Sequence, residues 1–142
     1  FDLDRNNFRV AMLISVNSIE IDDFDSAFEW AEKSMKISKN NAESLAHMGN
    51  LYYKAMQSCR EDAFSRSDKI VASLAYEYFV KAEQKGNSKY YKQKSWLEEN
   101  EVLFAYSDWF MTDKDIQATG KVSPVGRCYD WVSESLAKQS DW

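Results

Sequence analysis

The side chains that could carry chemistry are few in this chain of 142 residues. His47 is the sole histidine, and no cysteine or second histidine lies near it in the sequence to complete a zinc site or a nucleophile–base pair. No glycine-rich stretch that could hold a phosphate group is present. We therefore predict a structural role for His47, no enzyme activity, and no cofactor or metal.

The two cysteines, Cys59 and Cys128, are too few for a disulfide framework and do not fix the redox compartment. Cys128 occupies a position that small residues take in the octet pattern described below, which predicts that its thiol is buried. Cys59 falls near the end of a predicted helix. A bond between the two cysteines is the alternative to two separate thiols.

Composition and charge exclude several classes of protein. The net charge of −5 argues against a nucleic-acid-binding surface, which needs clustered lysine and arginine. Apolar residues make up 44% and aromatic residues 15%, as in a folded domain and unlike a disordered segment. No apolar run approaches the length of a membrane-spanning helix, which needs about 18 apolar residues. Because the chain begins FDLDRNN without a methionine, we expect a fragment of a longer protein.

One octet pattern occurs three times and indicates helices. Its copies read small, aromatic, acidic, aromatic, with a second small residue at or near the end. The chain has only four glycines and one proline, which favours long helices with short connections. No stretch shows the sustained two-residue alternation of a β-strand. We therefore predict an all-α fold. The three copies are AFEWAEKS at residues 27–34, AYEYFVKA at residues 75–82 and CYDWVSES at residues 128–135.

The run AESLAHMGNLYYKA, residues 42–55, resembles the first helix of a tetratricopeptide repeat (TPR). That family has the pattern W-x2-L-G-x2-Y, followed by A-x3-F on the second helix, with a period of about 34 residues. Gly49 and Tyr52 match the first part, and Ala75 and Phe79 match the second. Because small residues let two helices approach closely, we expect tight contact between the helices that carry Gly49 and Ala75. The family period places Ser15 one repeat before Gly49. The resemblance implies a right-handed stack of antiparallel helix hairpins, a TPR-like α-solenoid.

This register divides a single domain, residues 1–142, into about three repeats: residues 8–41, 42–89 and 90–138. An insertion around QSCREDAFSRSDKI lengthens the second repeat, and we predict extra turns on both its helices. The chain should reverse near residues 62–67, with Ser65 or Ser67 capping the next helix. The third repeat is also lengthened, and its first helix must lie within residues 88–110. Ser123 and Pro124 predict the start of a last helix that runs to about Lys138.

The resemblance also implies a binding surface, because tetratricopeptide domains present a concave groove that is lined by first helices and usually binds peptides or protein segments. Asn50 and Lys54 are one helical turn apart and could hold a peptide backbone or a carboxylate, while Tyr53 would add apolar contact. The alternative is that these side chains are only what an average member of the family carries. The predicted groove residues are Arg9, Met12, Val16, Glu43, Asn50, Tyr53 and Lys54.

The predicted function is a non-catalytic protein–protein interaction scaffold that binds a peptide or protein partner of unknown identity. Two alternatives remain: an accessory or positioning domain of a larger enzyme, and a homo-oligomerisation module such as a homodimer. The aromatic residues within 90–110 are interpreted as core and cap, or else as a terminal binding face. The acidic cluster of Glu20, Asp22, Asp23 and Asp25 is interpreted as a solvated turn, with a docking patch for a basic partner as the alternative.

Overall fold

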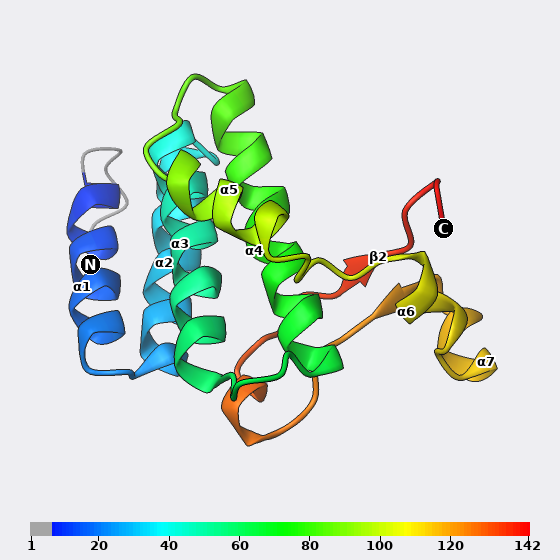
Figure 1. Ribbon diagram of the computed structural model, residues 1–142. Coiled ribbons are helices and arrows are strands. Elements are labelled where there is room, and N and C mark those ends of the chain that lie inside the picture. Colours follow the sequence, from blue (N-terminus) through cyan, green and yellow to red (C-terminus); the bar gives the residue numbers. More distant parts are fainter. Residues whose placement is uncertain (1–6) are drawn as a thin grey trace.

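Four long helices stand side by side and form the body of the molecule, as the computed structural model of residues 7–142 shows (Figure 1). The first and second helices form one hairpin, the third and fourth form another, and the second helix packs against the third. The prediction of a mostly helical chain is confirmed. The helices are α1 (Phe8–Glu20), α2 (Phe24–Ser38), α3 (Ala42–Cys59) and α4 (Arg66–Gln84).

Short polar side chains fix where three of these helices begin. Asp23 accepts a hydrogen bond from the backbone N–H of Ser26 at the start of α2, and Asn41 does the same for Ser44 at the start of α3. Ser65 and Asp68 bond reciprocally to each other's backbone N–H groups, which is a capping box at the start of α4. The predicted chain reversal near residues 62–67, with a cap at Ser65, is therefore confirmed.

Gly49 marks a tight contact between α3 and α4. A Cβ atom placed there would lie 2.7 Å from two ring carbons of Phe79 and 3.2 Å from the backbone oxygen of Ala75. Only a residue without a side chain leaves room for this contact. The predicted close approach of Gly49 to the helix that carries Ala75 is confirmed.

The chain after α4 departs from the predicted third hairpin. It contains three short helices, a two-stranded antiparallel ladder that pairs Val122 with Leu136, and a 3-10 turn, but no long helix. The predicted last helix from Ser123 to about Lys138 is therefore wrong, as is the count of three complete hairpins. These elements are α5 (Tyr91–Glu99), α6 (Tyr106–Phe110), α7 (Lys114–Gln117), β1 (Lys121–Val122), the 3-10 turn (Arg127–Tyr129) and β2 (Leu136–Ala137).

The third octet forms no α-helix because long-range bonds override its helical pattern; it begins in the 3-10 turn and continues as irregular chain to β2. Residues 128–136, which we call the strap, run over the helical body and are anchored to it by several side chains described below. Each anchor joins the strap to a residue distant in sequence, so no local rule specifies it. Within residues 7–142, no helix is long and apolar enough to cross a membrane.

Candidate functional site

A small hollow of about 160 Å³ lies between α1 and α3 and is closed on one side by the segment that follows α4. Met12 and Val16 are one helical turn apart and so face it together from α1. Ala46 lies on the facing helix and adds a third apolar wall. The full lining consists of Met12, Val16, Glu43, Ala46, His47, Asn87, Lys89 and Tyr90.

His47 is held as a neutral donor beside this hollow. Its Nε2 lies 2.7 Å from the Oγ of Ser15, and that hydroxyl donates its one proton to the backbone oxygen of Ala27 at 2.6 Å. Nε2 must therefore carry a proton and donate it to Ser15. Burial, and to a lesser extent the charge of Lys89, lowers the pKa of His47 to about 4. The predicted structural role of His47 is confirmed, because this chain of bonds joins α3 to both helices of the first hairpin.

The mouth of the hollow carries charges of both signs. Arg9 and Glu43 form an ion pair of 3.3 Å across α1 and α3, with side chains 69% and 39% exposed. An ion pair this exposed contributes little to stability, so it can open at small cost when another charged group arrives. Lys89 is exposed and lies on the opposite segment. The mouth can therefore pair with either an acidic or a basic group of a ligand.

The structure divides the predicted groove residues into two sets. Met12, Val16 and Glu43 line the hollow, and Arg9 is tied to its rim. Asn50, Tyr53 and Lys54 lie further along α3 and do not line it. Whether any of them contacts a partner stays a prediction.

Helix α5 passes over α3 in the view of Figure 1, and its Trp96 contacts one residue of the second set. The ring of Tyr53 meets the ring of Trp96 on α5 edge-on, with centroids 5.9 Å apart. The side-chain oxygen of Asn50 is buried and has no hydrogen-bond partner among the described residues, whereas Lys54 is exposed. Part of the predicted groove is therefore in contact with the chain's own fifth helix.

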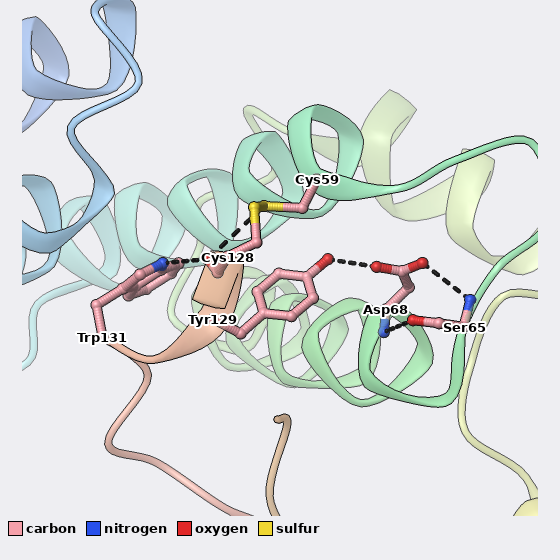
Figure 2. Close-up of a disulfide and its surroundings, with 6 residues drawn as sticks. All are labelled: Cys59, Ser65, Asp68, Cys128, Tyr129 and Trp131. Atoms are coloured by element: carbon pink, nitrogen blue, oxygen red, sulfur yellow. Dashed lines mark hydrogen bonds between the residues drawn. A yellow bond between two sulfur atoms is a disulfide. The ribbon is translucent and has the colours of Figure 1, made fainter. Parts of the chain in front are cut away.

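A disulfide between Cys59 and Cys128 joins the end of α3 to the strap, with Cα atoms 6.0 Å apart (Figure 2). The alternative of a bond between the two cysteines is therefore confirmed, and the prediction of a buried Cys128 is wrong, because this residue is exposed. A helix through residues 128–135 would have placed Cys128 against a neighbouring helix. In the 3-10 turn at the start of the strap the same residue lies at the surface, where it reaches Cys59.

Two aromatic residues of the strap flank this disulfide. Tyr129 is buried and donates its hydroxyl proton to Asp68, the carboxylate that also caps α4 (Figure 2). Trp131 packs its indole ring on Phe28 and Tyr52, with centroids 5.6 and 5.8 Å apart. The indole N–H donates to the backbone oxygen of Cys128 at 2.7 Å. These contacts tie the strap to α2, α3 and α4 at once.

Glu134 forms the last of these anchors. Its two carboxylate oxygens accept the hydroxyl protons of Tyr52, at 2.5 Å, and Tyr78, at 2.6 Å. Burial first, and then the charge of Glu134, raises the pKa of Tyr52 above its ordinary range, and burial with the bond to Glu134 does the same for Tyr78. Both hydroxyls thus stay protonated and able to donate. The sequence held no signal for this pairing beyond the carboxylate itself.

Comparison with protein families, with curated proteins and with solved structures finds no match. The arrangement of side chains within the chain therefore has to carry the functional argument.

Proposed function

We propose that this chain is a non-catalytic protein-interaction module, and that the hollow between α1 and α3 receives one side chain of a partner peptide or protein segment. The observation that carries the proposal is the combination of an apolar interior with a mouth of mixed charge. Met12, Val16 and Ala46 offer apolar contact, while Glu43 and Lys89 can bond to the polar backbone or neighbouring side chains of the segment.

The size of the hollow favours a side chain over a whole small molecule. Sites for cofactors and drug-sized ligands enclose roughly 300–1,000 Å³. The hollow measures about 160 Å³, which is too little for such a ligand. The rest of a bound segment would lie over the exposed rim beside Arg9 and Lys89.

A second line of support comes from equivalent contacts in the two hairpins. In the first hairpin, Ser15 of α1 bonds to the backbone oxygen of Ala27 on α2. In the second, Gly49 of α3 lies against the backbone oxygen of Ala75 on α4. Ser15 and Gly49 are the positions that the tetratricopeptide register makes equivalent, and so are Ala27 and Ala75. We propose that α1–α4 are two repeats of a right-handed TPR-like α-solenoid, with the hollow in its concave groove.

One alternative has an observation in its favour. Val10 and Leu13 project from α1 with exposed fractions of 50% and 60%, and they alternate with the Met12 and Val16 side that lines the hollow. An exposed apolar strip on a terminal helix suits packing against a second copy. Homo-oligomerisation through α1 is therefore the second candidate.

Selection of peptides from a random displayed library tests the primary proposal. We expect peptides selected on the wild-type chain to lose at least ten-fold in affinity for Val16→Glu, which places a charge in the hollow. Leu13→Glu is the matched control on the same helix, and it should leave peptide affinity unchanged. Light scattering of both variants addresses the second candidate, because a homodimer through the exposed strip would be lost in Leu13→Glu alone. Peptides that bind Val16→Glu as tightly as wild type would refute the hollow as the site.

A further inference from the structure

The strap is attached to the helical body through side chains. Within residues 7–142, no backbone–backbone hydrogen bond joins residues 128–136 to α2, α3 or α4. The N–H of Tyr129 bonds to the backbone oxygen of Gly126 just before the strap, the N–H of Val132 bonds to Tyr129 within it, and Leu136 pairs with β1. Segments with few backbone hydrogen bonds to their surroundings open locally at lower free energy than the helices beneath them. The strap can therefore detach as a unit when one of its anchors is lost.

The surface under the strap is rich in aromatic side chains. The indole ring of Trp131 packs on three rings of the helical body: those of Phe24 and Phe28 from α2 and Tyr52 from α3. The distances between ring centroids are 6.0 Å or less. Tyr78 of α4 stacks on Tyr52 at 5.9 Å. Detachment of the strap would expose an aromatic surface built from three helices, together with the two hydroxyls that Glu134 now holds.

The disulfide is placed where a reductant can reach it. Cys128 is exposed, and both cysteines line an open hollow of about 460 Å³ beside the start of α4. Arg127 and Glu61 stand in the same wall. Disulfides that are accessible to an incoming thiolate are the ones that exchange readily, whereas buried disulfides resist reduction.

We propose that the bond between Cys59 and Cys128 is a redox-sensitive latch, whose reduction by a dithiol releases the strap and exposes the aromatic surface of α2, α3 and α4. The thiolate of the reductant attacks the Sγ of Cys128 and forms a mixed disulfide, and Cys59 leaves as a thiolate that takes up a proton. The reductant's second thiolate then attacks the reductant sulfur that is bonded to Cys128 in the mixed disulfide, and Cys128 leaves as a thiolate. Two electrons pass to the protein, and the reductant becomes an intramolecular disulfide.

Several contacts that stabilise the helical body do not involve the strap and so persist after reduction. The helices α2, α3 and α4 keep their caps at Asp23, Asn41 and Ser65. The contact of Gly49 with Phe79 lies between α3 and α4 and does not involve the strap. Reduction is therefore expected to open the strap selectively and to leave the four long helices folded.

Hydrogen exchange of the full chain, followed by mass spectrometry, tests the latch. The oxidised chain is compared with the chain reduced by dithiothreitol and with the double variant Cys59→Ser/Cys128→Ser, and all samples are reduced in the acid quench so that the same peptides are recovered. We expect the peptide that contains Tyr129 and Val132, whose N–H groups are hydrogen-bonded, to exchange these amides at least ten-fold faster after reduction, while peptides from the middle of α3 and α4 keep their protection. The double variant should match the reduced chain.

Three results would overturn the proposal. Unchanged protection of Tyr129 and Val132 in the reduced chain would show that the remaining anchors suffice to hold the strap. An equal loss of protection in α3 and α4 would show that the disulfide staples the whole fold. A disulfide that survives excess dithiothreitol until a denaturant is added would show that no reductant reaches it in the folded protein. If the double variant fails to fold, the comparison of oxidised with reduced wild-type chain decides alone.

Discussion

Gly49→Ala offers a quantitative test of how the second hairpin is packed. The new methyl group would lie 2.7 Å from the Cδ1 and Cε1 atoms of Phe79 and 3.2 Å from the backbone oxygen of Ala75. Phe79 is buried, so its ring cannot move into solvent to relieve the contact. Either the ring or the whole of α4 must shift.

Two opposing effects set the expected magnitude. Alanine in place of glycine inside a helix stabilises by roughly 0.5–1 kcal/mol. Overpacking of a well-filled core destabilises by about 1–3 kcal/mol. The second effect exceeds the first, and we expect a net loss of roughly 1 kcal/mol in the free energy of unfolding. Gly49→Leu adds further bulk with no space to take it, and its loss should approach about 3 kcal/mol.

A double-mutant cycle with Phe79→Leu isolates the contact. Urea denaturation of the wild type, both single variants and the double variant gives the four free energies. Because the smaller side chain makes room for the methyl group, the double variant should be more stable than the sum of the single losses by roughly 1 kcal/mol. Lys54→Ala, an exposed change on the same helix, is the control. Additivity within about 0.5 kcal/mol would show that Gly49 and Phe79 are not in close contact, and would refute the reasoning.

Three further predictions concern the site and the strap. The pKa of His47 is lowered to about 4, against roughly 6.5 in the unfolded chain, so the unfolded state binds more protons between these values; stability should therefore fall by up to about 3 kcal/mol as the pH drops from 7 to 4. Denaturation of a His47→Gln variant checks this, because it should lack that part of the pH dependence. Glu134→Gln removes the charge from two hydrogen bonds and should cost about 1–3 kcal/mol of unfolding free energy in urea denaturation; a variant as stable as wild type would show that the carboxylate contributes nothing. Asn50→Ala/Lys54→Ala should leave stability within about 1 kcal/mol of wild type and reduce the affinity of library-selected peptides that extend along α3 beyond the hollow; a double variant that binds them unchanged would show that contact with a partner does not reach Asn50 and Lys54.

The helical body could be predicted from the sequence because its signals are local. The first octet copy, at residues 27–34, and the run at residues 42–55 indicated α2 and α3. Two serines in the predicted reversal, Ser65 and Ser67, indicated where α4 begins, and Ser65 is the residue that caps it. Gly49 and Ala75 gave the tight contact, because only small residues allow two helices to come so close.

The strap could not be predicted, since its third octet carries the same local pattern as two real helices. What differs is long-range: Cys128 bonds to Cys59 across a sequence separation of 69, and Glu134 bonds to Tyr52 across 82 residues. The candidate site was found only in part for the same reason. The tetratricopeptide resemblance placed Met12 and Val16 in one groove, but nothing local indicated that Trp96 of α5 would pack on Tyr53.

The sequence separation of the two cysteines also has a consequence for biosynthesis. A ribosome that adds about 5–20 residues per second makes Cys128 roughly 3–14 s after Cys59. During that interval the hairpins can fold, yet Cys59 is an unpaired thiol and the rings of Phe28 and Tyr52 lack the indole that later packs on them. A nascent chain that stalls before Trp131 would thus present a reactive thiol close to an exposed, aggregation-prone aromatic surface. Such truncated chains are expected to form mixed disulfides and aggregates in an oxidising compartment.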